Sequence, residues 1–279
     1  MIHLFKLNGH RIVFNTDTGA AHPVSALAMK IAEVVSPPLS EECPSSLRYS
    51  FAKFDSHDLN EAYGEVYALW KSTGCADAAP HPVTETVHAD APEALSLVRQ
   101  RASAGSIPLR IYISGASVSL VEEIRKEFPA SRVCLISDLC GTEVSPAELE
   151  KLNRGECYLH LPEGNTLCDA LTAAKEYGVR YAYTSLPDST EPKELIRAAK
   201  LLEAWQEDGA TVRFSPFVFA MDTETRNGDL PAGCNGCWAF PLCQGSCAEN
   251  GSLSSVRCDL RRLCTECGIV LTHNKKSSE

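Results

Sequence analysis

The chain has 279 residues, 44% of them hydrophobic and 22% charged, with 17 Gly and 16 Pro. This composition is globular and excludes a disordered tail protein, a collagen-like fibre and a long coiled coil. Acidic residues outnumber basic ones 36 to 26, and the formal charge of −10 argues against a general nucleic-acid binder. The sequence has neither the roughly 18-residue apolar run that spans a membrane nor an export signal, so we expect a cytoplasmic protein.

Residues 1–75 are predicted to form a small winged-helix-like unit. Two β-prone segments flank Asn8-Gly9, which is a strong signal for a two-residue hairpin turn. Ser25 is a candidate N-cap for the helix that follows the strands. The predicted strands cover Ile2–Leu7, His10–Asn15 and Ala20–Val24, and the predicted helices cover Ala26–Val35 and Leu59–Lys71.

Residues 76–106 are rich in Ala, Pro, His and Glu and are predicted to be a connector with one helix over 92–102. Over residues 107–230, strands alternate with amphipathic helices, which predicts an α/β fold with a parallel sheet and right-handed crossovers. Five strands are too few for a closed eight-stranded barrel, so we expect an open, partial β/α barrel. The predicted strands are 109–114, 132–137, 157–161, 179–185 and 210–219, and the predicted helices are 118–128, 146–152, 166–177 and 192–207.

Cysteines are concentrated near the end of the chain. Seven of the 13 lie within the segment from Cys234 to Cys267. An odd total in a chain without an export signal argues against a disulfide framework, and dense cysteines in a reducing compartment indicate a metal site. The core spacing is C-x2-C-x5-C-x3-C. The candidate metal ligands are Cys234, Cys237, Cys243, Cys247, Cys258, Cys264 and Cys267.

Two metal centres suit such a set of thiolates. Thiolate-only ligation is typical of iron–sulfur clusters and of zinc, and it excludes ions that prefer oxygen ligands. A zinc site usually shows two well-separated pairs of ligands, often with histidine. Here the spacings are unequal and no histidine lies between Cys234 and Cys267, which favours a cluster, with zinc as the alternative.

This spacing, with its trailing cysteine, resembles the SPASM domain, the C-terminal extension of radical SAM enzymes that modify peptides. The segments 237–239, 258–260 and 266–267 resemble the form found in maturases of SCIFF peptides, which build thioether crosslinks in a ribosomal precursor. Residues 2–9 and 19–22 are similar to the start of the same maturases, which belongs to a leader-peptide recognition module. The resemblance implies a SPASM-like extension over residues 231–272 and a peptide precursor as the partner.

The sequence departs from this family where radical SAM chemistry is carried out. The family needs a C-x3-C-x2-C loop after the first barrel strand, but residues 76–106 contain no cysteine and no other cysteines have this spacing. The Gly-Gly-Glu-Pro segment that holds the SAM amino group corresponds here to Ser114-Gly115-Ala116-Ser117, without carboxylate or proline. We therefore expect no SAM cofactor, no SAM cleavage and no catalytic residues of that kind.

The resemblance implies one [4Fe–4S] cluster, held by Cys234, Cys237, Cys243 and Cys258. In the family, the cysteine matching Cys247 reaches a second cluster, whose other ligands lie upstream. No cysteine lies between residues 168 and 234, so we expect no second cluster. Three cysteines then remain as spare thiols or as a replacement ligand: Cys247, Cys264 and Cys267.

The expected function is that of an accessory, non-catalytic iron–sulfur protein. It would bind the leader of a ribosomally made peptide by strand addition and work beside a complete radical SAM enzyme. A redox peptide-modifying enzyme with a non-standard centre and a zinc-binding structural protein are the alternatives. Cysteines outside the C-terminal block are interpreted as small buried side chains, and Asp138 is interpreted as part of a solvated loop.

Overall fold

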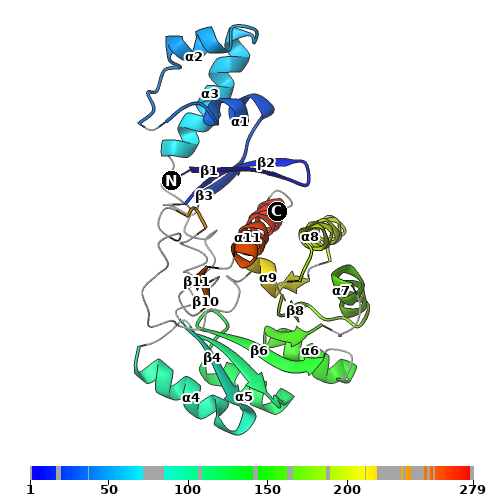
Figure 1. Cartoon of the computed structure of the whole chain (residues 1–279). Helices are drawn as coiled ribbons and strands as arrows, with labels where there is room; N and C mark the ends of the chain where they lie inside the picture. Colours follow the sequence, from blue (N-terminus) through cyan, green and yellow to red (C-terminus); the bar gives the residue numbers. More distant parts are fainter. Residues whose placement is uncertain are drawn as a thin grey trace. The chain divides into compact units, whose positions relative to one another are not determined.

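The computed structural model (Figure 1) divides into two compact units, Met1–Ala79 with Ile269–Glu279, and Pro80–Gly268. The residues that the structure describes are 2–16, 20–36, 38–71, 85–105, 109–140, 144–161, 166–186, 189–210, 212–218, 234, 237–239, 248–249, 252–253 and 255–276.

The first unit begins with a three-stranded antiparallel sheet in the order β1-β2-β3. Asn8 and Gly9 turn β1 into β2 with φ angles of 51° and 89°, the positive values that a type I′ hairpin turn requires. The predicted hairpin is therefore confirmed. Residues 17–19, between β2 and β3, lie outside the described residues. The strands are β1 (Ile2–Leu7), β2 (His10–Asn15) and β3 (Ala20–Pro23).

Three helices follow this sheet. The Ser25 hydroxyl accepts a hydrogen bond from the Ala28 amide at 3.1 Å, which confirms the predicted N-cap. The Ser25 amide in turn donates to Glu65 of α3 at 2.9 Å and so ties two helices together. The first helix ends at Ala32, earlier than predicted, and α2 was not predicted. The helices are α1 (Ala26–Ala32), α2 (Ser45–Ser50) and α3 (Ser56–Lys71).

A six-stranded parallel sheet forms the second unit, in the order β4-β5-β6-β7-β8-β9. The predicted α/β class and open sheet are confirmed. The prediction that residues 76–106 form a connector before the sheet is wrong. Residues 85–90 form β4 and pair with β5 along their whole length, because a neighbouring strand stabilises a segment with little β-propensity of its own. The strands are β4 (Glu85–Asp90), β5 (Leu109–Ser114), β6 (Val133–Cys140), β7 (Cys157–His160), β8 (Tyr181–Tyr183) and β9 (Arg213–Phe214).

The strand order determines where the helices lie. Parallel strands that follow one another in chain order through right-handed crossovers place every connecting helix on the same face of the sheet. Figure 1 shows α4 to α8 in an arc around the strands. The helices are α4 (Ala91–Ser103), α5 (Val118–Glu127), α6 (Pro146–Arg154), α7 (Leu167–Glu176) and α8 (Pro192–Glu207).

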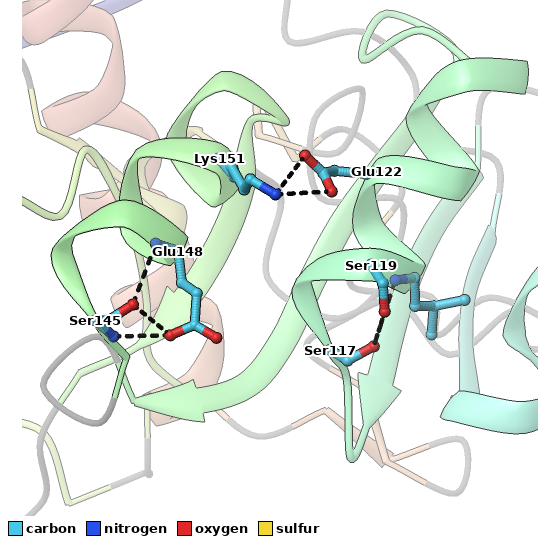
Figure 2. Close-up of polar contacts among 7 residues, drawn as sticks. Ser117, Ser119, Glu122, Ser145, Glu148 and Lys151 are labelled. Atoms are coloured by element: carbon cyan, nitrogen blue, oxygen red, sulfur yellow. Dashed lines mark hydrogen bonds and ion pairs between the residues drawn. The ribbon is translucent and has the colours of Figure 1, made fainter.

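Serine side chains cap the first turns of two of these helices. Ser145 and Glu148 form a reciprocal capping box at the start of α6, and Ser117 caps α5 (Figure 2). An ion pair of 3.3 Å between Lys151 and Glu122 joins the two helices on their exposed sides. Such exposed pairs contribute little to stability, so the register of the helices depends on their buried apolar faces.

The chain leaves the sheet earlier than predicted. The predicted last strand, 210–219, is a two-residue β9 followed by α9 (Ser215–Val218). Pro216 has no amide hydrogen to donate and a fixed φ, so it begins a helical turn rather than continuing a strand. A short hairpin of β10 (Ala248–Glu249) and β11 (Ser252–Leu253) precedes the long helix α11 (Ser255–Lys276).

Helix α11 approaches α9 more closely than a side chain at the contact would allow. A Cβ atom added at Gly268 would lie 2.0 Å from the carbonyl oxygen of Phe217, which is itself buried. Real Cβ atoms do not approach backbone oxygens to this distance. Glycine at position 268 therefore allows α11 to pack against the end of the sheet.

We expect Gly268→Ala to lower the free energy of unfolding by about 1–3 kcal/mol, because the added methyl group overpacks this contact. Gly64→Ala is the matched control, since a Cβ at this exposed helical position meets nothing within 4 Å. Alanine there should raise the free energy of unfolding by roughly 0.5–1 kcal/mol. Denaturant unfolding checks both values, and equal effects of the two substitutions would contradict the close approach.

Candidate functional site

Two of the predicted metal ligands form a tight turn. The Cys237 amide donates a hydrogen bond to the carbonyl oxygen of Cys234 at 3.2 Å. Cys234 is buried, with 5% of its surface exposed, and Cys237 is half-buried. A turn of this kind holds two thiols on one side of the chain, as the C-x2-C spacing predicts.

Helix α11 carries the other three described cysteines of the block. Cys258 is half-buried near the start of the helix, whereas Cys264 and Cys267 are 2% and 0% exposed. Two and a half helical turns separate Cys258 from Cys267, so these two side chains project from opposite sides of α11. Cys264 and Cys267 thus belong to the buried side of the helix.

Burial also sets the acidity of these two thiols. It raises the pKa of Cys264 to about 12, and it raises the pKa of Cys267 as well, with the neighbouring Cys264 as a smaller cause. Both groups are neutral at physiological pH and pack as small apolar side chains. This position fits the interpretation of Cys264 and Cys267 as spare thiols.

Arg262 connects the cysteine turn to α11. Its Nη2 atom donates a hydrogen bond to Sγ of Cys237 at 3.5 Å, and its Nη1 atom lies 3.4 Å from a carboxylate oxygen of Asp259. Arg262 follows Cys258 by one helical turn, so both residues lie on the same side of α11. The hydrogen bond to Cys237 raises the pKa of Arg262 above its ordinary value, with nearby Cys258 and Asp259 acting in the same direction.

The full set of predicted ligands is not brought together by the part of the chain that the structure describes. Cys243 and Cys247 lie outside the described residues. Among the residues that are described, no three His, Cys, Asp or Glu side chains converge as a metal ion requires. The metal site at Cys234, Cys237 and Cys258 therefore stays a prediction, with Arg262 as an additional neighbour that the sequence analysis missed.

A second cluster of polar and aromatic side chains lies on the sheet. Ile111, Leu135 and Leu159 are completely buried on one face. Residues at alternate positions project from the other face, which α4 to α8 do not cover, and Ile136, Tyr158 and Tyr183 on that face are buried as well. Tyr112 and His160 meet there, with the phenol oxygen 3.0 Å from Nε2 of the imidazole. The rings of His88 and Tyr183 contact this pair, and Tyr158 and Tyr181 form a second ring contact on the same face.

The sequence itself distinguishes this second face of the sheet, called the inner face below, from the face that α4 to α8 cover. Strands of a parallel sheet covered on both sides are continuously apolar. In β7 and β8, by contrast, polar or aromatic residues occur at every second position, as in Tyr158-Leu159-His160. This alternation indicates a face that the connecting helices α4 to α8 do not cover.

The loop after β5 contains residues 114–117, which the sequence resemblance predicted to correspond to the segment that holds the SAM amino group. Gly115 has a φ of 66°, and its amide donates to Asp138 of β6 at 2.7 Å. The Ala116 amide also faces this carboxylate, at 3.4 Å. Asp138 is exposed, as expected, but it is held by two backbone amides rather than lying in a solvated loop.

Comparison with known proteins adds no further assignment. A scan against models of protein families finds no match, and a search of curated proteins finds no significant relative. None of the helices in the described ranges has both the length and the apolar character needed to cross a bilayer.

Two thiols on the sheet, Cys134 and Cys157, should react slowly with alkylating reagents. Burial raises the pKa of Cys157 to about 12, with a smaller opposing effect of Arg125, and it raises the pKa of Cys134 to about 11. A free cysteine titrates near 8.5, so at pH 8 the thiolate form of both residues is scarcer by a factor of at least about 100. Timed iodoacetamide labelling with mass spectrometry should show this lag, and prior unfolding should remove it. Labelling of native Cys157 at the rate of free cysteine would contradict the assignment.

Proposed function

We propose that the chain is an accessory, radical SAM/SPASM-like iron–sulfur protein that binds a ribosomally made peptide precursor and does not cleave SAM. The observation that carries the proposal is the meeting of the Cys234–Cys237 turn with α11 through Arg262. This contact gathers soft sulfur donors beside a fixed positive charge, and Cys258 projects from the same side of the helix. The residue chemistry fits a thiolate-bound cluster.

In this proposal, Cys234, Cys237 and Cys258 hold a [4Fe–4S] cluster together with Cys243. When bound, such a cluster supplies one-electron transfer or purely structural support. Arg262 keeps a hydrogen-bond donor on the Cys237 sulfur, and the close contact at Gly268 keeps α11 against the sheet. Two segments of the chain, the Cys234–Cys237 turn and α11, thus position the sulfur atoms that would bind the cluster.

Two features of the sheet support the absence of SAM cleavage. Strand β4 ends at Asp90 and α4 begins at Ala91, so no loop separates the first strand from its helix. A cluster-binding loop of the radical SAM type needs at least the eight residues of its C-x3-C-x2-C motif. In addition, Asp138 occupies the amides of Gly115 and Ala116, where the resembled family would bind SAM.

The N-terminal sheet supports peptide binding by strand addition. In a two-residue hairpin, the residues flanking the turn form a hydrogen-bonded pair, and such pairs then alternate along the ladder. Leu7 and Phe5 therefore bond to β2, whereas the backbone groups of Leu4 and Lys6 point away from it. At the other edge, Pro23 has no amide to offer. The longer strand β1 is thus the better template for an extended peptide.

A redox peptide-modifying enzyme is the second candidate. The observation that favours it is the Tyr112–His160 pair on the inner face of the sheet, because these groups can hold and move a proton at the carboxyl ends of the strands. Formation of 5′-deoxyadenosine from SAM by the anaerobically reconstituted protein distinguishes the candidates. Its production above a protein-free control would overturn the accessory assignment.

The metal centre is tested by cysteine replacement. We expect the protein purified without oxygen to contain iron and acid-labile sulfide, and we expect Cys234→Ser and Cys237→Ser each to lose most of both. Cys264→Ala is the matched control and should retain the metal, because this thiol lies on the buried side of α11. Metal analysis checks the result. Zinc without sulfide would replace the cluster by the zinc alternative, and a metal-free protein would refute both.

Peptide binding is tested on the full chain with synthetic leader segments of short peptides encoded beside its gene. We expect saturable heat in a calorimetric titration and slower hydrogen exchange at the amides of Leu4 and Lys6 in the complex, because a paired strand protects outward-facing amides. The Ala21 amide on β3 is the internal comparison. Protection at Ala21 alone would move the site to the other edge, and the absence of any heat or protection would remove the peptide-binding proposal.

A further inference from the structure

The environment of Arg262 differs from that of an ordinary surface arginine. Its side chain is 41% exposed, and its guanidinium group is shared between Sγ of Cys237, at 3.5 Å, and the carboxylate of Asp259, at 3.4 Å. Asp259 itself is 73% exposed, so water screens its charge. The sulfur is therefore the less hydrated of the two partners of this guanidinium.

The chemistry of the contact depends on the charge of the sulfur. A neutral thiol is a weak hydrogen-bond acceptor, whereas a sulfur that carries negative charge accepts strongly from a cation. The Arg262 guanidinium, held on Cys237 by a helix, thus places a charged donor where a metal-bound sulfur would accept a strong hydrogen bond. Hydrogen bonds to ligand sulfurs are among the factors that set the reduction potential of an iron–sulfur cluster.

We propose that Arg262 tunes the cluster bound at Cys237, raising its reduction potential through the hydrogen bond to Sγ. The inference rests on the proposed iron–sulfur centre. Reduction adds one electron, supplied in the test by dithionite, and therefore one negative charge. A fixed positive charge beside the sulfur stabilises the reduced form more than the oxidised form. Arg262 acts as a positioning and tuning residue and contacts no substrate.

The test is a redox titration of the anaerobically reconstituted full chain, followed by the electron paramagnetic resonance signal of the reduced cluster. We compare the natural sequence with Arg262→Gln and Arg262→Lys. Arg197→Gln is the matched control, because it removes one positive charge from an exposed residue of α8 whose charge acts on Cys168, a thiol outside the proposed cluster. Iron and sulfide content is measured for each protein before titration.

We expect the ratio of reduced to oxidised cluster at a fixed potential to fall about tenfold in Arg262→Gln, a shift of about 59 mV for a one-electron couple. Arg262→Lys should lie closer to the natural protein, and Arg197→Gln should match it. If Arg262→Gln assembles no cluster while Arg262→Lys does, the dependence on a charge at this position is supported as well.

Two results would count against the inference, and each would overturn a different part of it. Equal potentials in the natural protein and Arg262→Gln, with full iron and sulfide in both, would overturn the role of Arg262 and leave the proposed cluster in place. A natural protein without iron and sulfide would overturn the cluster itself, and the role of Arg262 with it.

Discussion

The arrangement of helices in the second unit follows from the handedness of the connections between its strands. Six parallel strands follow one another in chain order, and right-handed crossovers place every connecting helix on one face of their sheet. The opposite face must then be covered in some other way or carry side chains that tolerate partial exposure. This face carries rings and hydroxyls, with Tyr112 and His160 at the centre, and Tyr158 and Tyr183 among them are buried. A sheet wound on both sides would require apolar residues at the same positions.

The candidate metal centre depends instead on contacts between segments that are distant in sequence. The cysteine turn is local, but its connection to α11 passes through Arg262, 25 residues away from Cys237. The path of α11 is in turn limited by Gly268, the only type of residue that fits against Phe217. The chemistry proposed for the C-terminal block thus requires the sheet unit as a scaffold, although it uses none of the strand residues.

Local signals predicted much of this structure. Asn8-Gly9 specified the hairpin, and Ser25 marked a helix start, because each motif satisfies its own backbone groups within a few residues. Strand β4 was missed because its pairing partner, rather than its own composition, makes it a strand. The contact between Arg262 and Cys237 could not be predicted, since the spacing of the cysteines carries no information about an arginine that lies on a helix later in the chain.

The carboxylate of Asp138 has a consequence for any molecule that reaches the strand ends. Its oxygens already accept hydrogen bonds from the Gly115 and Ala116 amides. A carboxylate or phosphate that arrives there must displace Asp138 from these amides and must also approach its negative charge. The two amides are therefore a less favourable place for an anion than they would be without Asp138.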